Sequence, residues 1–221
     1  MIKGPILFIT GAGASVDSGL PTYRGKGGVY EGGNPEDDLS ISVWEKYPQT
    51  TWARLKPLVA AVRKATPGPT YELIEKIGQK YATTIYTQNV DGFSKRVCGD
   101  VWEMHGNLET MECERCRKIF PLDHEKPECP QCGELCKPNI VFYGEDIRHK
   151  TSHHGLNYFN TAIVIGTTLQ FRYLQNMINT LKMKGCTVIH INPDPTYTVG
   201  KGEILMRMKS ANALKLLFGL I

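Results

Sequence analysis

The sequence has no long hydrophobic run. None of its segments approaches the roughly twenty consecutive apolar residues that a membrane-spanning helix requires. The first apolar stretch, residues 6–9, is shorter than the core of a signal peptide, and no small-residue cleavage site follows it. From these absences we expect a cytoplasmic protein with no membrane partner.

Concentrated positive charge is also missing. The net charge is only +4, and basic residues occur as short pairs such as Arg63-Lys64 and Lys95-Arg96. Because nucleic-acid-binding proteins usually gather Lys and Arg into a stripe on one face, a nucleic-acid partner is not expected. Hydrophobic residues make up 41% of the chain, which is too many for a disordered protein and enough for a buried core.

Short β-branched, apolar runs alternate with amphipathic stretches along the chain. The runs predict buried strands at residues 6–10, 83–87, 162–166 and 187–192. The amphipathic stretches at 71–81 and 173–184 have the spacing of helices. Strands that alternate with helices predict an α/β fold with a Rossmann-like parallel sheet.

Two regions interrupt this alternation. Residues 25–69 begin rich in Gly, Pro and charge and then become helical from Trp44 to Lys64, whereas residues 107–138 hold five of the seven cysteines. We therefore expect a sheet domain that carries two inserts. The predicted boundaries are 1–27, 66–106 and 141–221 for the Rossmann-like domain, 28–65 for a cofactor-loop and helical insert, and 107–140 for a zinc-ribbon insert.

Four of the cysteines form two C-x-x-C pairs with twelve residues between the pairs: Cys113, Cys116, Cys129 and Cys132. Four thiolates at this spacing suit tetrahedral coordination of one Zn²⁺. A closed site of four sulfurs leaves no position for water or substrate, so the zinc is expected to be structural. Cys136 lies just outside this pattern and could be an alternate ligand, a free thiol or a packing residue, of which packing is expected. Cys98 and Cys186 are expected to be buried small residues.

A glycine-rich loop follows the first predicted strand. Gly11 and Gly13 would allow the backbone to approach a phosphate, and a following helix would point free N–H groups at it. Val16 stands where the usual dinucleotide fingerprint has its third glycine. The loop by itself is therefore also compatible with an ordinary turn between a strand and a helix.

Polar residues follow the strand predicted at 83–87. Gln88, Asn89 and Asp91 could hydrogen-bond ribose hydroxyls and a carboxamide, or they could cap a helix. His105 comes next, before the cysteine region. A lone histidine is more often structural, but an imidazole near neutrality suits general-base work on a hydroxyl.

These motifs, in this order, resemble those of the sirtuins, the NAD-dependent protein deacylases. The resemblance rests on the run from Gly11 to Ser15, the run from Ser18 to Gly25, the run from Thr87 to Asp91, the pair His105-Gly106 and the four-cysteine ribbon. It covers nearly the whole chain. Tyr23 stands where the family usually has Phe.

The resemblance implies specific roles for residues of this chain. It implies that NAD contacts Gly11, Ala12, Gly13, Ser15, Thr22, Tyr23, Arg24, Gln88, Asn89, Asp91, Gly166, Thr167, Thr168, Asn192 and Ala211. His105 would be the catalytic base, with Asn89 and Asp91 beside it in the reacting pocket.

The segment 137–145 is similar to the part of sirtuins that pairs with an acylated-lysine peptide. By that resemblance Val141, Phe142 and Gly144 contact the substrate, and backbone pairing supplies most of the affinity. The family usually has Arg where Lys137 stands and Phe where Tyr143 stands.

The resemblance also implies a reaction in which NAD is consumed as a co-substrate. The acyl group of a protein lysine passes to ADP-ribose, which yields nicotinamide, O-acyl-ADP-ribose and free lysine. The same pocket could instead serve an ADP-ribosyltransferase or an NAD hydrolase. A non-catalytic zinc-ribbon binding protein regulated by NAD is the alternative from another class.

A preference for neutral acyl groups is expected. Sirtuins that remove succinyl or malonyl groups carry a Tyr-x-x-Arg pair, and alignment on Trp52 puts Leu55 and Leu58 at those positions. A buried carboxylate without a cation would be costly. The run from Pro21 to Arg24 nevertheless resembles the opening loop of those same acidic-acyl members.

Overall fold

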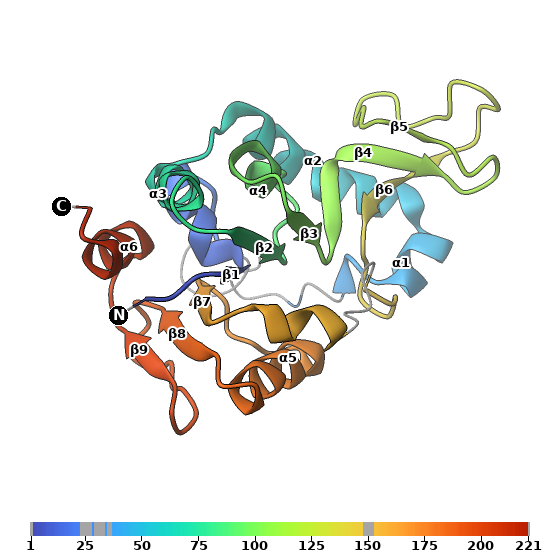
Figure 1. Cartoon of the computed structure of the whole chain (residues 1–221). Helices are drawn as coiled ribbons and strands as arrows, with labels where there is room; N and C mark the ends of the chain where they lie inside the picture. The colour runs from blue at the N-terminus through green and yellow to red at the C-terminus, as the bar shows by residue number, and fades with distance from the viewer. Residues whose placement is uncertain (1, 23–27, 29–33, 35–36, 148–152, 221) are drawn as a thin grey trace.

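A parallel sheet of six strands forms the centre of the protein, in the order β3-β2-β1-β7-β8-β9 (Figure 1). The computed structural model describes residues 2–22, 28, 34, 37–147 and 153–220. The strands are β1 (Ile6–Thr10), β2 (Thr83–Thr87), β3 (Val101–Glu103), β7 (Thr161–Ile165), β8 (Thr187–Ile191) and β9 (Ile204–Met206). The predicted parallel α/β sheet is confirmed, and the four predicted strands lie within one residue of their expected ends.

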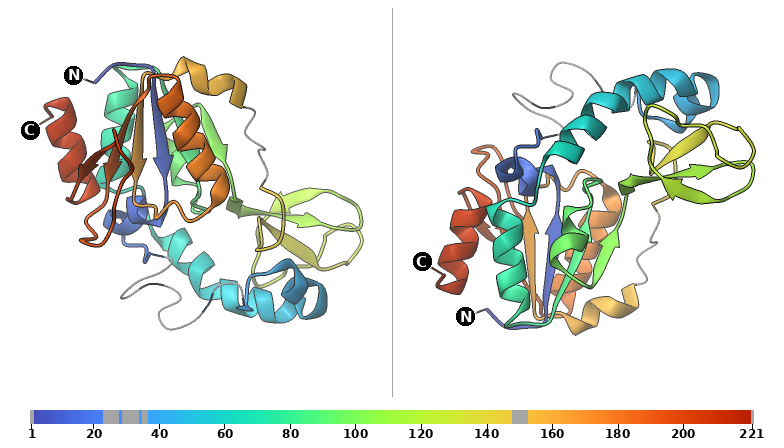
Figure 2. Two further views of the ribbon diagram at one scale, coloured as in Figure 1. Left: turned by 90° about the horizontal axis from the view of Figure 1, so that it is seen from below. Right: turned by 90° about the horizontal axis from the view of Figure 1, so that it is seen from above.

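The side chains of the central strands divide between two hydrophobic cores because successive residues of a strand point to opposite faces. Ile6 and Phe8 of β1 pack with α3 (Pro69–Gly78) and α6 (Ser210–Phe218). Leu7 and Ile9 pack with α5 (Arg172–Met183) and the 3₁₀ helix η3 (His153–Tyr158) on the other face (Figure 2). Phe8 is fully buried, so its replacement by Ala would cost about 3–5 kcal/mol.

Strand β1 lies at the point where the connections of the sheet reverse direction. It pairs with β2 on one side and with β7 on the other. The loops that leave these strands therefore run to opposite faces and open a crevice at their carboxyl ends, where open α/β sheets bind ligands. The loop after β1 continues into the 3₁₀ helix η1 (Ala12–Ser18).

A second body lies beyond these carboxyl ends (Figure 2). It contains an antiparallel sheet in the order β5-β4-β6, and helices α1 (Ile41–Lys46) and α2 (Pro48–Lys64). The strands are β4 (Gly106–Cys113), β5 (Ile119–Pro121) and β6 (Cys136–Ile140). The short helix α4 (Phe93–Val97) connects toward β3.

The two inserts of the sequence pack against each other in this body. The indole Nε1 of Trp52 on α2 donates a hydrogen bond to the carbonyl of Cys136 on β6 at 3.0 Å. Trp44 on α1 lies with its ring centroid 5.9 Å from that of Phe142. Helix α2 begins at Pro48, which suits the first turn of a helix because its missing N–H would have no partner there.

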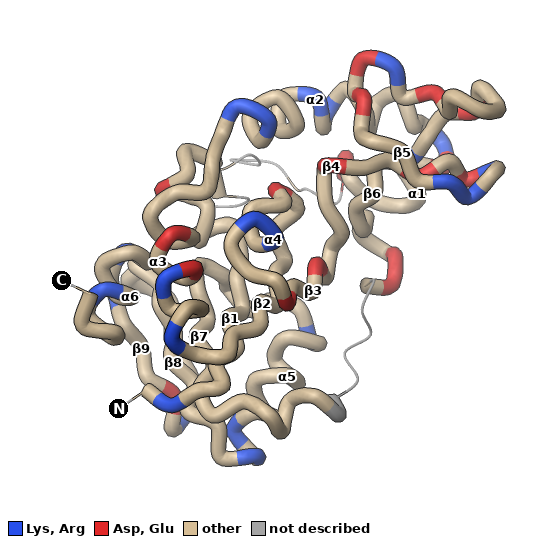
Figure 3. Tube along the Cα trace, turned by 45° about the horizontal axis from the view of Figure 1, so that its top comes forward, with Lys and Arg blue, Asp and Glu red and all other residues tan. Residues whose placement is uncertain are grey.

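Positive and negative residues are interspersed along the described trace (Figure 3). Among the residues that the structure describes, no helix combines the length and the apolar character needed to span a bilayer.

Candidate active site

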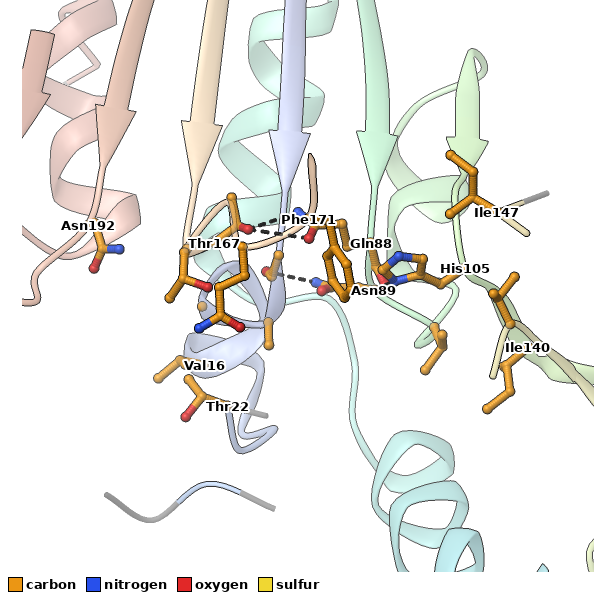
Figure 4. Close-up of a pocket in the computed structure, with 18 of the residues that line it drawn as sticks. Val16, Thr22, Gln88, Asn89, His105, Ile140, Ile147, Thr167, Phe171 and Asn192 are labelled. Carbon is orange, nitrogen blue, oxygen red and sulfur yellow. Dashed lines mark hydrogen bonds between the residues drawn. The ribbon is translucent and has the colours of Figure 1, made fainter. Parts of the chain in front are cut away.

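A cavity of about 1130 Å³ lies between the carboxyl ends of the central strands and the second body (Figure 4). It brings together residues that are far apart in the sequence. Of the predicted site residues, those that line it are Gly11, Ala12, Gly13, Thr22, Gln88, Asn89, His105, Val141, Phe142, Gly144, Gly166, Thr167, Thr168 and Asn192. Tyr23 and Arg24 lie outside the described residues.

The glycine loop touches the loop after β7 backbone to backbone. The amide of Gly13 donates to the carbonyl of Gly166 at 2.9 Å. A Cβ atom at Gly13 would lie 2.5 Å from the Cα of Gly166, so only glycine fits this close approach. The side chain of Val16 is 52% exposed and faces the cavity, which explains why no third glycine is needed there.

The side chain of Asn89 is held in place by hydrogen bonds to buried polar groups. Its Nδ2 donates to the carbonyl of Gly11 and to the hydroxyl of Ser15, each at 3.0 Å. The Ser15 hydroxyl in turn donates to a carboxylate oxygen of Asp91 at 2.6 Å. Burial raises the pKa of the Asp91 carboxyl, and the backbone amide of Phe93 donates to its other oxygen. Neither Ser15 nor Asp91 is among the residues that line the cavity. Ser15 supports Asn89 directly, and Asp91 supports it through Ser15.

Gln88 ties the ends of β2 and β7 together across β1. Its Nε2 donates to the Thr167 hydroxyl at 3.0 Å (Figure 4). Asn192 follows β8 and accepts a hydrogen bond from the amide of Asp194 at 3.0 Å. Ala211 does not line the cavity, although its neighbour Ser210 does.

Both ring nitrogens of His105 are hydrogen-bonded. Nδ1 lies 2.9 Å from the carbonyl oxygen of Gln88, and because a carbonyl can only accept, Nδ1 carries the proton of the neutral ring. Nε2 is therefore the basic nitrogen, and it lies 3.0 Å from the hydroxyl of Tyr173. Burial lowers the pKa of His105, which favours the neutral imidazole that a general base requires.

The predicted substrate segment is braced by one ion pair. Nζ of Lys137 donates to Oε2 of Glu145 at 2.9 Å, and the same oxygen accepts from the amide of Phe142 at 2.7 Å. Strand β6 ends at Ile140, and the amide of Val141 then donates to the carbonyl of His105 at 2.8 Å. The segment predicted to bind substrate is thereby fixed directly to His105.

Several residues of the cavity wall were not predicted from the sequence. The main ones are Ile140, Tyr143, Ile147, Phe171, Tyr173 and Lys209. Phe171 and Tyr173 lie a few residues after the carboxyl end of β7. Ligands of parallel sheets bind at such strand ends, so this position could have indicated that the two residues belong to the site. The sequence indicated only that Tyr173 begins a helix.

The structure gives Leu55 and Leu58 no part in the cavity. Leu55 is 1% exposed and Leu58 packs against the same core, and neither is among the lining residues. Alignment on Trp52 therefore does not identify acyl-contacting positions. Among the described residues of the cavity wall, the only Lys or Arg is Lys209, which precedes α6.

The four predicted zinc ligands form one cluster, with all four sulfur atoms within 4.8 Å of one another. The Cys113–Cys132 and Cys116–Cys129 sulfur distances are both 3.5 Å, close to the roughly 3.8 Å implied by tetrahedral Zn–S bonds of about 2.3 Å. Backbone amides of Cys116 and Gln131 also point at sulfurs of the cluster, at 3.4 Å each. The donor set fits a structural Zn²⁺, and none of the four lines the cavity.

The other cysteines lie outside this cluster. Cys136 is fully buried in the core, as expected for a packing residue, and Cys186 is also buried. Cys98 is only half-buried, so the prediction that it is buried was wrong. Its thiol lies near the carbonyls of Thr83 and Asp100 at the edge of the sheet.

Comparison with known proteins gives a consistent result. The chain is 28% identical to an NAD-dependent protein deacylase of Thermus thermophilus over 96% of this chain and 88% of the relative. It is 30% identical to NAD-dependent protein deacylase 2 of Pseudomonas syringae pv. tomato, over 95% of this chain and 92% of the relative.

The fold is likewise similar to that of solved structures. A Sir2 homologue, a mutant in complex with 2′-O-acetyl-ADP-ribose, superposes with a TM-score of 0.86 at 26% identity, over 96% of this chain and 89% of that one. The sequence pattern of the Sir2 family matches residues 11–172. The resemblance seen in the sequence is thus confirmed, and the chain belongs to the Sir2 family.

Proposed function

We propose that the protein is an NAD-dependent protein lysine deacylase that prefers neutral acyl groups. Its products would be nicotinamide, O-acyl-ADP-ribose and free lysine. The observation that carries the proposal is one cavity lined by the glycine loop, the polar end of β2, His105 and the segment after β6. The names of its relatives and the acetyl-ADP-ribose complex of a homologue support the same reaction.

The residues that would hold NAD lie along the carboxyl ends of β1, β7 and β8. The loop from Gly11 to Gly13 would approach the phosphates, and Thr167 and Asn192 would bind sugar hydroxyls. When bound, NAD supplies a ribose carbon from which nicotinamide can leave. Gln88 and Asn89 offer amide groups at the end where the chain also places His105.

The acylated lysine would enter from the second body. An extended peptide can pair with the backbone near Val141 and Gly144, and the modified side chain then points toward His105. His105 would accept the proton of a ribose hydroxyl at Nε2, because Nδ1 is committed to the Gln88 carbonyl. This proton transfer frees the hydroxyl oxygen to attack the acyl carbon.

The preference for neutral acyl groups rests on the composition of the cavity wall. Beside His105 the described wall includes the side chains of Phe171, Tyr173 and Ile140. Glu145, on the same wall, is already paired with Lys137. An acidic acyl group would lose its water there without gaining a cation from the described residues beside His105. Acetyl or longer uncharged groups carry no such cost.

The zinc would serve as a structural brace, and we keep the division of the chain that the sequence predicts. We assign residues 1–27, 66–106 and 141–221 to the sheet domain, 28–65 to the helical insert and 107–140 to the ribbon. None of the seven cysteines forms a disulfide, and cysteines without disulfides are usual in a reducing compartment. A cytoplasmic location is part of the proposal.

Mass spectrometry of the products tests the reaction. Incubation of NAD with an acetylated-lysine peptide should give nicotinamide, free lysine and O-acetyl-ADP-ribose, and succinylated peptide should react at least tenfold more slowly. Nicotinamide release without any acylated peptide would instead favour an NAD hydrolase or an ADP-ribosyltransferase. NAD binding without turnover would indicate a non-catalytic binding protein.

His105→Ala tests the assignment of the base. Because general-base catalysis contributes about 10²–10⁴-fold, the variant should lose deacylation by a factor in that range. Zinc content should be unchanged, since His105 is outside the cysteine cluster. The matched control is His124→Ala, which removes a histidine of the ribbon that does not line the cavity and should retain activity. Near-wild-type turnover by the His105→Ala variant would contradict the assignment.

A further inference from the structure

Tyr173 occupies the basic nitrogen of the proposed catalytic base. Its hydroxyl lies 3.0 Å from Nε2 of His105. Tyr173 also lines the cavity, and its ring stacks on Phe171 with centroids 5.8 Å apart and an interplanar angle of 24°. Phe171 in turn meets the His105 ring edge to face at 5.4 Å (Figure 4). These two aromatic residues therefore form the wall beside the reacting nitrogen.

The direction of this hydrogen bond follows from the other side of the imidazole. Nδ1 must donate to the Gln88 carbonyl, so Nε2 of the neutral ring has a lone pair and no proton. The phenol must then be the donor. Burial raises the pKa of Tyr173, so its hydroxyl keeps its proton across the working pH range. The lone pair of the base is therefore already engaged in the free protein.

The backbone before Tyr173 is arranged to keep this geometry. Leu169 has a φ of +53°, in the left-handed region that a non-glycine residue rarely adopts. Its amide is bound by the Thr167 hydroxyl at 3.2 Å and its carbonyl by Gln175 at 3.0 Å. Leu174 and Met177 then anchor the first turns of α5 with fully buried side chains. Tyr173 is thus held on a fixed element and not on a free loop.

A phenol has one proton and oxygen lone pairs that can accept. With its proton directed at Nε2, the Tyr173 oxygen still has a lone pair that can accept, and Tyr173 is one of the residues that line the cavity. A ribose hydroxyl that reaches this end of the cavity can donate to that oxygen without breaking the Tyr173–His105 bond. Direct contact with Nε2 would require the phenol to leave.

We propose that Tyr173 is a catalytic relay residue that passes the proton of the ribose hydroxyl to His105. This rests on the proposed function. In one concerted step the ribose O–H bond breaks and a new O–H bond forms on Tyr173, while the original Tyr173 O–H bond breaks and an N–H bond forms at Nε2. The ribose oxygen keeps the electron pair with which it attacks, Tyr173 ends unchanged, and His105 becomes imidazolium.

Tyr173→Phe tests the relay because it removes one oxygen and keeps the ring. Deacylation in a single turnover should fall about tenfold to a hundredfold, a part of the general-base contribution. Exchange of labelled nicotinamide into NAD, dependent on acetylated peptide, should persist within about threefold, because nicotinamide leaves before this proton moves. The matched control is Tyr158→Phe, on an exposed tyrosine of η3, which should change neither rate.

The outcomes separate the relay from the proposed function. A wild-type protein that shows neither exchange nor deacylation refutes the proposed function, and the relay with it. A Tyr173→Phe variant that deacylates within twofold of wild type refutes the relay alone. Faster deacylation with a lower KM for NAD also refutes it, because the hydroxyl would then be a competitor for Nε2.

A measurement on the free protein gives an independent readout. In ¹⁵N NMR above the pKa of His105, the Nε2 resonance should lie at the position of a hydrogen-bonded lone pair. Tyr173→Phe should move it toward the position of an unbonded nitrogen, with zinc content and thermal midpoint unchanged. An unmoved resonance would show that the hydroxyl does not bind Nε2, and the relay would be excluded.

Discussion

The parallel sheet and the cysteine ribbon achieve stability in different ways. Every residue of β1 is buried, and side chains on both faces of the sheet pack in large apolar cores. The ribbon has three strands, and two of the three residues of β5 are exposed. Its two cysteine knuckles meet at a cluster of four sulfurs. The sheet is therefore stabilised by burial of apolar side chains, and we expect the ribbon to depend also on a bound metal.

The two regions also differ in what they give to the cavity. The sheet contributes strand ends with polar side chains, which suit a cofactor, and the second body contributes an extended segment, which suits a peptide. His105 joins them, since its ring bonds the carbonyl of Gln88 and its carbonyl bonds the amide of Val141. Substitutions in the sheet should therefore weaken cofactor binding, whereas substitutions in the second body should weaken peptide binding.

Removal of a zinc ligand should have the largest effect. We expect Cys129→Ser to release the metal and to unfold the ribbon, because structural zinc supplies about 10–16 kcal/mol of apparent binding energy in zinc-finger peptides. The loss here should be smaller, since Trp52 and ribbon residues such as Met111 belong to a hydrophobic core that is continuous with that of the sheet. Metal analysis and hydrogen exchange would measure it: protection should be lost in residues 106–140 and retained in β1 and β7.

Cys186→Ala is the matched control for that experiment. Cys186 is buried beside β8 but lies outside the sulfur cluster, so this variant should keep one zinc per chain. If Cys129→Ser still binds one zinc per chain, or if β1 loses protection together with the ribbon, the two regions are not stabilised separately.

Gly13→Ala should have an intermediate effect, confined to the sheet side. The new methyl group would lie 2.5 Å from the Cα of Gly166, and overpacking of this kind costs about 1–3 kcal/mol. Because every 1.4 kcal/mol is about tenfold in affinity, we expect NAD binding to weaken by roughly tenfold or more. Calorimetric titration would measure the affinity, and zinc content should not change.

Gly99→Ala is the control for the glycine experiment. A Cβ at Gly99 meets no atom within 4 Å, so this variant should bind NAD as wild type does. Equal NAD affinity of the Gly13→Ala variant would show that the contact between the two loops does not shape the site.

The pH dependence of the reaction should show the smallest effect, at the residue that joins the two regions. His105 must be neutral to accept a proton, and burial lowers its pKa from the ordinary 6.5. The acid limb of log(kcat/KM) should therefore have its midpoint below pH 6.5. Steady-state rates at constant ionic strength would measure this, and an acid limb centred above pH 6.5 would contradict it.

Much of the fold could be predicted because its signals are local. The strand at 6–10 is an unbroken apolar run, and buried parallel strands have that composition. The zinc site follows from two C-x-x-C pairs, whose short spacing nearly fixes their geometry. Helical periodicity at 173–184 likewise predicted α5 to within one residue at each end.

The less predictable features depend on contacts between distant segments. Ser15 and Asp91 are 76 residues apart, and only the packing of η1 against the end of β2 turns both side chains toward each other and away from the cavity. The helical insert and the ribbon were expected as separate inserts, yet Trp52 joins them. Alignment placed Leu55 at a position that contacts the acyl group, but the side chain points from α2 into the hydrophobic core.

The sequence by itself determined the order of the strands and helices along the chain, the sulfur cluster and the motifs that indicate the family. These properties reside in neighbouring residues, whose spacing limits what the backbone can form. Only the tertiary structure decided which side chains reach the cavity. Tyr173 is 68 residues from His105. The two side chains meet because the chain after β7 and the first turn of α5 place Tyr173 beside His105.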